Sequence, residues 1–448
     1  MITNQDVICK IYRVEDLKPE EIRGNNNLNN NNQDENIKSV REQVSRILEQ
    51  VRRRGDDALR EYTRRFDGVE IENFLVTPEE IESAYDSLGE EFQEVLLQAA
   101  ANIEKFHEKQ IRRDYVITDE KQPGVITGLR FTPIERVGIC IPASPKAFPS
   151  SILMNVIPAR LAGVKEIVLV TPPDQDGKIN PAALGAAYIA AENVKIYKIG
   201  GAQAVAALAY GTESVPAVNK IVGPVGVFVA EAKRQVSGQV GIDIIAGPSE
   251  ILIIADKNNN KNNPARIAAD MLSQAEHDIH ASAILITDED TLAQDVQAEL
   301  ALQVEKLPRR EIAEKSLKSN GKIIVTRDFN QAIEIANQIA PEHLELYVDN
   351  PFDYLSRIKN AGSVFLGRYA PEALGDYFAG PNHTLPTSGT ARFSGPLSVD
   401  DFVKKSSFIY YAPQALQAVA DQIAAFAENE GLHGHARSVL IRKEEARD

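Results

Sequence analysis

Gln274 and His277 are three residues apart in the segment SQAEH, and side chains at that spacing lie on one face of a helix. We predict that this helix has Asn263 as its N-cap and Pro264 as its first residue. Its apolar positions fall on the other face and should contact a core: Ile267, Ala268, Met271, Leu272 and Ala275. An imidazole and an amide oxygen are half of a small metal site, although glutamine is an uncommon zinc ligand. The alternative is a solvated face with a histidine near a helix C-terminus, where the dipole favours it.

A second candidate group is the adjacent pair Glu342 and His343, which follows Pro341 and immediately precedes a predicted strand. Such a pair can supply two proton-transfer groups to one pocket, because the pKa of histidine already lies near neutral pH. The alternative is a histidine at a strand edge that makes one hydrogen bond to the backbone. The pair is therefore a candidate for acid/base chemistry.

Two polar segments nearer the C-terminus hold further candidate ligands. Asp376 and His383 belong to residues 373–389, a predicted loop rich in turn-forming residues, and loops of that length are often functional. Glu430 and His435 belong to the segment EGLHGHA. One aspartate, one glutamine and two histidines would suit a divalent metal if the fold brought them together.

Length, charge and cysteine content limit the class of protein. A chain of 448 residues with 43% hydrophobic residues is long enough for two or three domains. Its net charge of -15, without a long basic segment, argues against nucleic acid or an anionic membrane as partner and favours small molecules. Cys9 and Cys140 are too few for a disulfide framework, which fits a reducing compartment. The N-terminus lacks the features of a signal peptide, so we expect a cytoplasmic protein.

Short β-branched runs alternate with alanine-rich helical segments from Gly138 onward, a pattern that predicts parallel sheets with helices on both faces. We predict an α/β fold of two tandem Rossmann-like, doubly wound units, with a helical N-terminal region and a small C-terminal tail domain. The expected division is residues 1–36, a segment with a disordered asparagine-rich insertion; 37–136, a helical region packing with the second unit; 137–249, the first unit; 250–397, the second unit; and 398–448, the tail domain and dimer contact.

The helical region is expected to contain three helices, near residues 37–53, 77–87 and 90–111, with Thr77 and Glu80 forming a capping box. In open α/β sheets ligands bind beyond the carboxyl ends of the strands, so functional residues should follow strands. Gly200 and Gly201 follow a predicted strand and open a helix, where the backbone could approach a phosphate. The alternative for this glycine pair is an ordinary tight turn.

Five segments of the chain, in order, resemble the signatures of histidinol dehydrogenases: AKRQVSGQVGIDIIAGPSE, DMLSQAEHD, APEHLEL, ALGDYFAGPNHTLPTSGTA and EGLHGHA. The resemblance covers nearly the whole chain after the asparagine tract. It implies the oxidation of L-histidinol through L-histidinal to L-histidine, with one zinc ion per subunit and two NAD molecules per turnover, in the last step of histidine biosynthesis. It also implies a homodimer.

The resemblance assigns roles to residues of this chain. The zinc ligands would be Gln274, His277, Asp376 and His435, the last supplied by the other subunit of the dimer. The acid/base pair would be Glu342 and His343, with His343 taking the alcohol and hydrate protons and Glu342 activating water. The residues matching the family's substrate contacts are Ser249, Gln274, His277, His343, Asp376, His383, Glu430 and His435.

The chain departs from the family pattern where nicotinamide should bind. Of the usual contacts only Gln203 is kept. A tyrosine and two glycines of the family are replaced by Cys140, Ala143 and Ser144, and a glycine and an asparagine by Val225 and Gly226. Side chains now stand where glycine would let the backbone approach a ligand. We therefore expect altered NAD affinity.

Two alternatives to a histidinol dehydrogenase stay open on the sequence. One is a paralogous zinc- and NAD-dependent dehydrogenase that acts on a different amino alcohol, because specificity of that kind depends on pocket shape. The other is a catalytically silent protein that binds histidine-like ligands. The intact pair Glu342 and His343 argues against the silent protein.

Overall fold

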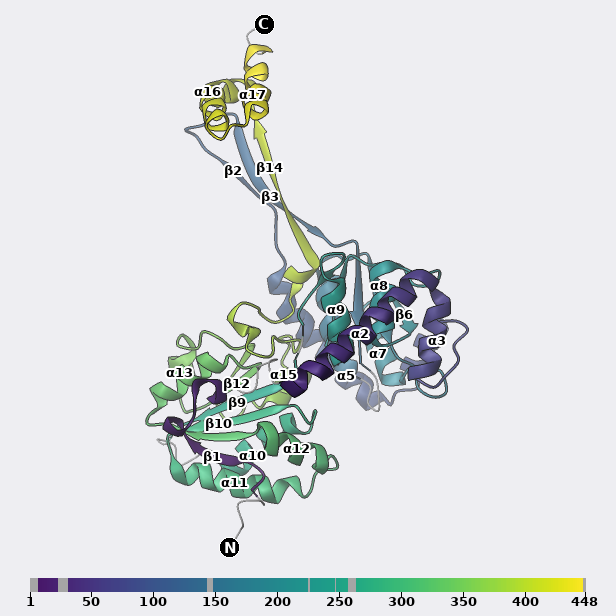
Figure 1. Ribbon diagram of the computed structural model, residues 1–448, viewed down its shortest axis with the longest axis vertical. Coiled ribbons are helices and arrows are strands. Elements are labelled where there is room, and N and C mark those ends of the chain that lie inside the picture. The colour runs from purple at the N-terminus through teal and green to yellow at the C-terminus, as the bar shows by residue number, and fades with distance from the viewer. Residues whose placement is uncertain are drawn as a thin grey trace.

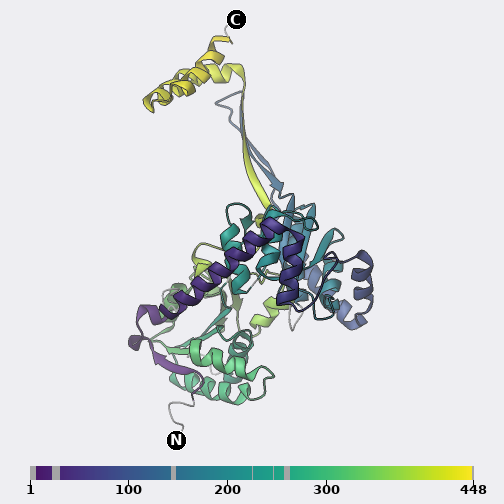
Figure 2. The same cartoon turned by 45° about the vertical axis from the view of Figure 1, so that its right-hand side comes forward.

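The computed structural model describes residues 7–22, 31–142, 148–224, 226–245, 247–256 and 263–445. Two α/β units lie next to each other, and a long arm projects from them and carries the C-terminal helices at its tip (Figure 1). A second view shows the arm extending away from both units (Figure 2). None of the helices within the described residues has both the length and the apolar character needed to cross a membrane.

The first unit is built on a five-stranded parallel sheet in the order β6-β5-β4-β7-β8. Its strands are β4 (Arg136–Cys140), β5 (Glu166–Thr171), β6 (Val194–Lys198), β7 (Lys220–Val222) and β8 (Gly241–Ile242). Alternate residues of these strands join two cores, one with α6 (Pro149–Leu161) and α7 (Pro181–Ala190), the other with α8 (Gly201–Tyr210) and α9 (Val227–Val236). Helices therefore cover both faces, as predicted.

The second unit repeats this order in a six-stranded parallel sheet, β1-β11-β10-β9-β12-β13. Its strands are β1 (Lys10–Arg13), β9 (Glu250–Ala255), β10 (Ser282–Thr287), β11 (Lys322–Val325), β12 (His343–Tyr347) and β13 (Ser363–Leu366). Its helices are α1 (Pro19–Ile22), α10 (Pro264–Ala275), α11 (Asp290–Val304), α12 (Arg310–Asn320), α13 (Phe329–Ile339), α14 (Phe352–Leu355) and α15 (Glu372–Tyr377). The strand order reverses between β4 and β7 in the first unit and between β9 and β12 in the second. This is the Rossmann arrangement.

The helical region packs against the first unit, so the prediction that it packs with the second unit was wrong. Its helices are α2 (Asn31–Arg54), α3 (Asp56–Phe66), α4 (Pro78–Asp86) and α5 (Glu90–His107). The apolar faces of α4 and α5 join the core around α6 and α7, while those of α2 and α3 join the core around α8 (Figure 1). An apolar stripe predicts that a helix face is buried but does not identify the surface that buries it.

The N-terminal segment and the asparagine tract also differ in part from the prediction. Strand β1 pairs with β11, so the first described residues belong to the second unit. Helix α2 begins at Asn31, inside the tract, while residues 24–30 lie outside the described residues. The capping box of Thr77 and Glu80 is confirmed at α4, and α3 was not predicted. Short 3-10 helices occupy Val14–Asp16, Glu108–Gln110, Thr390–Arg392 and Val399–Phe402.

The arm is a three-stranded antiparallel sheet, β14-β3-β2, that ends in two helices. These elements are β2 (Tyr115–Thr118), β3 (Val125–Pro133), β14 (Val403–Tyr411), α16 (Pro413–Asn429) and α17 (His433–Glu445). The C-terminal segment is therefore no separate domain, because β14 needs β3 from the preceding region to form a sheet. Large apolar side chains of the arm are exposed, among them Val116 (60%), Ile409 (73%) and Phe426 (70%).

Candidate active site and metal centre

Glu342 and His343 both form hydrogen bonds with the backbone of Glu250 on the neighbouring strand. The Nδ1–H of His343 donates to the carbonyl oxygen of Glu250 at 2.9 Å, and Oε2 of Glu342 accepts from the backbone N–H of Glu250 at 2.8 Å. Because a carbonyl can only accept, the proton of the neutral imidazole sits on Nδ1 and the lone pair on Nε2. Both side chains are buried, and His343 Nε2 has no hydrogen-bond partner among the described residues.

Burial shifts the pKa of each member of this pair toward its neutral form. It lowers the pKa of His343 to about 4, so the imidazole is free to accept a proton at neutral pH. Burial, reinforced by the carboxylates of Glu250 and Asp376, raises the pKa of Glu342 well above its usual range. A neutral imidazole and a carboxyl group with a raised pKa are both suited to proton transfer.

Three further side chains converge on one point in front of this pair. One ligand atom each of His277, Glu372 and Asp376 lies within 4.8 Å of the others. Burial and the neighbouring carboxylate of Glu372 raise the pKa of Asp376 to about 8. Paired carboxyl groups with an imidazole suit a divalent cation, whose charge would offset the repulsion between them.

Gln274 supplies an independent sign that a ligand belongs here. Its side chain is fully buried, and neither its amide oxygen nor its amide nitrogen has a partner among the described residues. An unpartnered buried amide is costly unless something absent from the protein chain binds it. The donor set therefore fits a metal, and the alternative of a solvated face for Gln274 is wrong.

The helix that carries Gln274 is largely as predicted. The side chain of Asn263 caps α10 by accepting from the N–H of Ala265, and the whole predicted apolar stripe is buried. The helix ends at Ala275, so His277 lies in the turn beyond it rather than within the helix. That turn exposes the His277 side chain while leaving it close to Asp376.

Glu372 was not identified from the sequence. It is the first residue of α15 and lies four positions before Asp376, so the two carboxyl groups share one face of that helix. Residues 373–389 had been predicted as a loop, which concealed this spacing. The signal available in the sequence was Pro371 followed by an acidic residue, a pattern typical of a helix start.

His383 links the two α/β units at the site. Its Nδ1–H donates to the backbone oxygen of Asp376 at 2.9 Å, and its Nε2 lies 3.1 Å from the hydroxyl oxygen of Ser151 on α6 of the first unit. The neighbouring Asn382 donates to the backbone oxygen of Met154, also on α6, at 2.6 Å. The loop that carries His383 is therefore held against the first unit.

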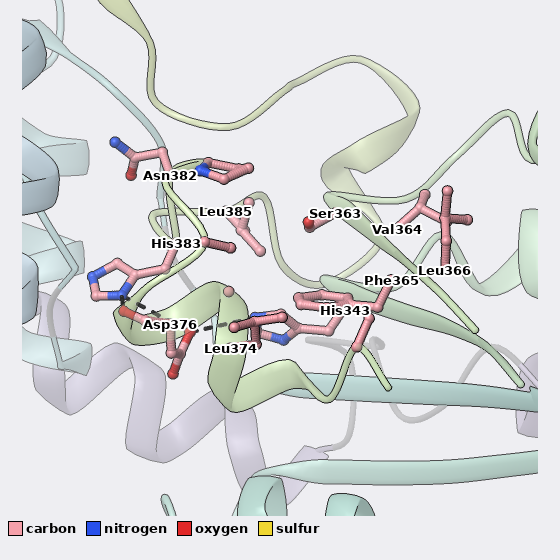
Figure 3. A pocket seen from close by; sticks show the side chains of 14 residues that line it. His343, Ser363, Val364, Phe365, Leu366, Leu374, Asp376, Asn382, His383 and Leu385 are labelled. Atoms are coloured by element: carbon pink, nitrogen blue, oxygen red, sulfur yellow. Dashed lines mark hydrogen bonds and ion pairs between the residues drawn. The ribbon is translucent and has the colours of Figure 1, made fainter. Parts of the chain in front are cut away.

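A cavity of about 240 Å³ opens between these groups (Figure 3). His343 enters it from the start of β12, while Asp376 and His383 come from α15 and the loop that follows (Figure 3). Phe365 of β13 lies 6.0 Å from the His343 ring, between ring centroids. Ser249 immediately precedes β9, next to Glu250. The catalytic candidates thus lie at the amino ends of β9 and β12, and the expectation that they follow strands was wrong for this unit.

Glu430 and His435 do not join the site within one chain. Glu430 is the C-cap of α16 and His435 lies in the first turn of α17, and both side chains are exposed. The two helices stand at the tip of the arm, away from the α/β units (Figure 1, Figure 2). His433, which matches no family role, is exposed at the same place.

A second cavity, of about 190 Å³, lies at the carboxyl edge of the first sheet, where its strand order reverses. Its lining includes Cys140, Pro172, Gly200, Gly201 and Gly226. Gly201 has a φ of 67°, and glycine adopts such backbone without strain. Two helix N-termini, of α8 and α9, begin at this cavity, as a bound phosphate would require.

The other residues predicted at the nicotinamide site are only partly placed. Gln203 is buried on α8, and its Oε1 has no partner among the described residues. Gly226 is the N-cap of α9, and a Cβ built there would meet nothing within 4 Å. Ala143, Ser144 and Val225 lie outside the described residues.

One unit has a glycine-lined cavity at the switch point of its parallel sheet, and the other has a buried Glu/His pair and clustered carboxyl groups, which together are typical of a two-unit α/β enzyme that binds a dinucleotide. Residues 30–443 match the model of the family described as histidinol dehydrogenase. The histidinol dehydrogenases of Clostridium acetobutylicum and Listeria monocytogenes are 53% and 51% identical to the chain. The first alignment covers 89% of this chain and 91% of the relative, the second 95% and 96%.

A crystal structure of the histidinol dehydrogenase from Elizabethkingia anophelis superposes with a TM-score of 0.89 at 36% identity, and the match covers 98% of this chain and 99% of that one. The chain belongs to the histidinol dehydrogenase family. The resemblance found in five sequence segments is thereby confirmed.

Proposed function

We propose that this protein is an L-histidinol dehydrogenase, which oxidises L-histidinol through L-histidinal to L-histidine with zinc and two molecules of NAD. The observation that carries the proposal is the pair of hydrogen bonds from Glu342 and His343 to the backbone of Glu250. They orient the neutral imidazole toward Asp376 and the side chains around it. Family membership supports the same substrate.

The chain supplies a proton acceptor for each oxidation. In the first, Nε2 of His343 takes the hydroxyl proton while a hydride leaves the same carbon, which gives the aldehyde. Glu342, in its ionised form, then takes a proton from water as the water oxygen adds to the aldehyde, and protonated His343 returns its proton to the aldehyde oxygen, which gives the hydrate. His343 takes a hydroxyl proton of the resulting hydrate as the second hydride leaves, and the product is a carboxylic acid. NAD supplies the acceptor for both hydrides.

Gln274, His277 and Asp376 would hold the zinc ion together with His435 of a second chain. Glu372 lies close enough to His277 and Asp376 to contribute negative charge or a ligand. A metal ion held by these residues would orient the substrate rather than generate hydroxide. Ser249 and His383, together with Glu430 at the arm tip of the second chain, complete the proposed substrate contacts.

The proposal is tested by measuring NADH formation by the purified, zinc-loaded protein with histidinol and, separately, with histidinal. We expect turnover of both. Turnover of another amino alcohol in preference to histidinol would identify a paralogous dehydrogenase. Binding of histidine without any turnover would identify a silent binding protein.

Replacement of Glu342 by glutamine should slow histidinal oxidation more than histidinol oxidation. The amide keeps an oxygen for the N–H of Glu250 but cannot accept a proton from water. Single-turnover measurements of NADH formation from each substrate separate the two steps. If both slow by the same factor, Glu342 does not activate water.

The proposed homodimer follows from the position of the arm. Glu430 and His435 are remote from the site of their own chain, and the exposed apolar side chains of the arm would be covered by a second copy. A site in one chain would then take His435 from its partner.

Mixing two inactive variants tests this exchange. In a heterodimer of His343→Asn and His435→Ala chains, one of the two sites has both histidines intact. We expect each variant alone to be inactive and activity to return after the two are dissociated together and reassociated. Each variant reassociated with itself is the control. A mixture as inactive as its components would contradict the exchange of His435.

The altered cofactor cavity should weaken NAD binding. Loss of an aromatic contact at Cys140 and of a side-chain hydrogen bond at Gly226 each removes about 1 kcal/mol. Relative to a family member with the usual residues, the Michaelis constant for NAD should rise on the order of tenfold to a hundredfold. The double variant Cys140→Tyr, Gly226→Asn should recover much of this loss, because Gly226 has open space and an ordinary φ of -72°.

Steady-state kinetics with varied NAD at saturating histidinol measures this recovery. Zinc content and the Michaelis constant for histidinol should not change, since both substitutions lie at the cavity of the first unit. A tight NAD constant in the unmodified protein, unaffected by the double substitution, would show that other residues make these contacts.

A further inference from the structure

Lys233 and Asp243 form an ion pair in the interior of the first unit. Their side chains are 0% and 2% exposed, and Nζ of Lys233 contacts Oδ1 of Asp243. Lys233 lies in the second half of α9, and Asp243 directly follows β8. Burying two charges costs about as much as their attraction returns, so a pair of apolar residues would hold this core equally well.

Both members of the pair also bind the backbone of Gly223. Oδ2 of Asp243 accepts from the N–H of Gly223 at 2.8 Å, and Nζ of Lys233 donates to its carbonyl oxygen at 3.2 Å. Both backbone hydrogen-bonding groups of one residue are therefore held by a single ion pair. An apolar pair could not do this, which gives the charged residues a specific role.

Gly223 stands at the point where β7 ends and the cofactor cavity begins. Its φ of 116° suits only glycine, and a Cβ built on it would lie 2.2 Å from the carbonyl oxygen of Cys140. The backbone after β7 is thus pressed against the end of β4. Gly226 lines the cavity and is the N-cap of α9, and Lys233, on the same helix, binds the carbonyl oxygen of Gly223, so the ion pair ties α9 to the end of β7.

We propose that Lys233 and Asp243 are positioning residues for the dinucleotide: by binding both hydrogen-bonding groups of Gly223, they form a clamp that holds the end of β7 and the N-terminus of α9 in the orientation that binds NAD. This inference rests on the proposed use of NAD at the cavity of the first unit. The pair touches neither zinc ligands nor the catalytic pair, so its effect should be confined to the cofactor.

The variant Asp243→Asn tests the clamp, because it removes the charge that pairs with Lys233. Asp56→Asn is the matched control. Asp56 is also a buried aspartate of the region that packs on the first unit, and it accepts from the backbone N–H of Ser214 at 3.3 Å, beyond the C-terminus of α8. Both variants should lower the melting temperature.

Only Asp243→Asn should weaken NAD binding, by about tenfold, the loss expected from one or two misplaced hydrogen bonds. Calorimetric titration of the zinc-loaded protein with NAD measures this, and histidinol binding should be unchanged in both variants. Equal weakening of NAD binding by Asp56→Asn would overturn the proposal, since the effect would then follow from general destabilisation.

The double variant Lys233→Met, Asp243→Leu separates positioning from stability. It leaves no unpaired charge in the core, so the melting temperature should recover relative to Asp243→Asn. NAD binding should stay about tenfold weaker, because Gly223 has lost both partners. A double variant that binds NAD like the unmodified protein would show that the pair serves only the core.

Hydrogen exchange distinguishes a failure of this inference from a failure of the proposed function. Without cofactor, the amides of residues 226–229 should exchange faster in Asp243→Asn than in Asp56→Asn or the unmodified protein. If the unmodified protein binds no NAD, the proposed function fails while the exchange experiment still tests the clamp. Unchanged exchange in Asp243→Asn would overturn the clamp itself.

Discussion

Replacement of Asp376 by alanine should abolish zinc binding and activity together. Asp376 is mostly buried and stands within 4.8 Å of ligand atoms of both His277 and Glu372, so its loss leaves the remaining groups around an under-coordinated cation. The fall in metal affinity should exceed the roughly 10- to 100-fold that follows removal of a residue that only supports a ligand. Because the substrate would be oriented by the same ion, turnover should fall in parallel.

Elemental analysis of the purified variant, together with NADH formation from histidinol, measures both quantities. Asp278→Ala is a matched control, because Asp278 follows His277 directly, carries the same charge and is exposed. That variant should keep its zinc and most of its activity. Full zinc occupancy in Asp376→Ala would show that the metal shell is wrongly assigned.

Local signals predicted the elements that carry the site. Asn263 with Pro264 defined the start of α10 and the apolar stripe its buried face, although the helix ends at Ala275, before His277. Helix capping and apolar periodicity depend on residues only a few positions apart, so both can be recognised in the sequence alone. The β-branched run EILIIA likewise predicted β9, which pairs in parallel with β12.

Convergence of distant segments could not be predicted in that way. Nothing in the spacing of Gln274, His343 and Asp376 along the chain places them in one site, because the crossover connections of a parallel sheet decide which loops meet. Their grouping was predicted from the family resemblance. Glu372 is not predicted from the sequence, because the resemblance does not name it and the turn-forming residues after it predict a loop where α15 stands.

The exposure of apolar residues in the arm could not be predicted from the sequence either. All four residues of β2 are exposed, including Val116 and Ile117, although their apolar character is typical of a buried strand. A sequence encodes the tendency to be buried but not whether its own chain or another one does the burying. For the same reason the apolar faces of α4 and α5 did not reveal that they pack on the first unit.

Replacement of His343 by asparagine should depress turnover by roughly 100-fold or more, the usual contribution of a positioned general base. An asparagine amide could still donate to the carbonyl oxygen of Glu250, as Nδ1–H of His343 does at 2.9 Å. It has no basic atom at the position of Nε2, which lies 4.0 Å from Oδ1 of Asp376. The substitution therefore removes proton transfer while keeping the anchor to β9.

Turnover with saturating histidinol and NAD measures this loss for both oxidations, which should slow together since His343 accepts a proton in each. Zinc content and melting temperature should stay close to those of the unmodified protein. His280→Asn, a substitution of an exposed histidine near the same turn as His277, should leave turnover nearly unchanged. A His343→Asn variant within a few fold of normal turnover would mean that another group removes the alcohol proton.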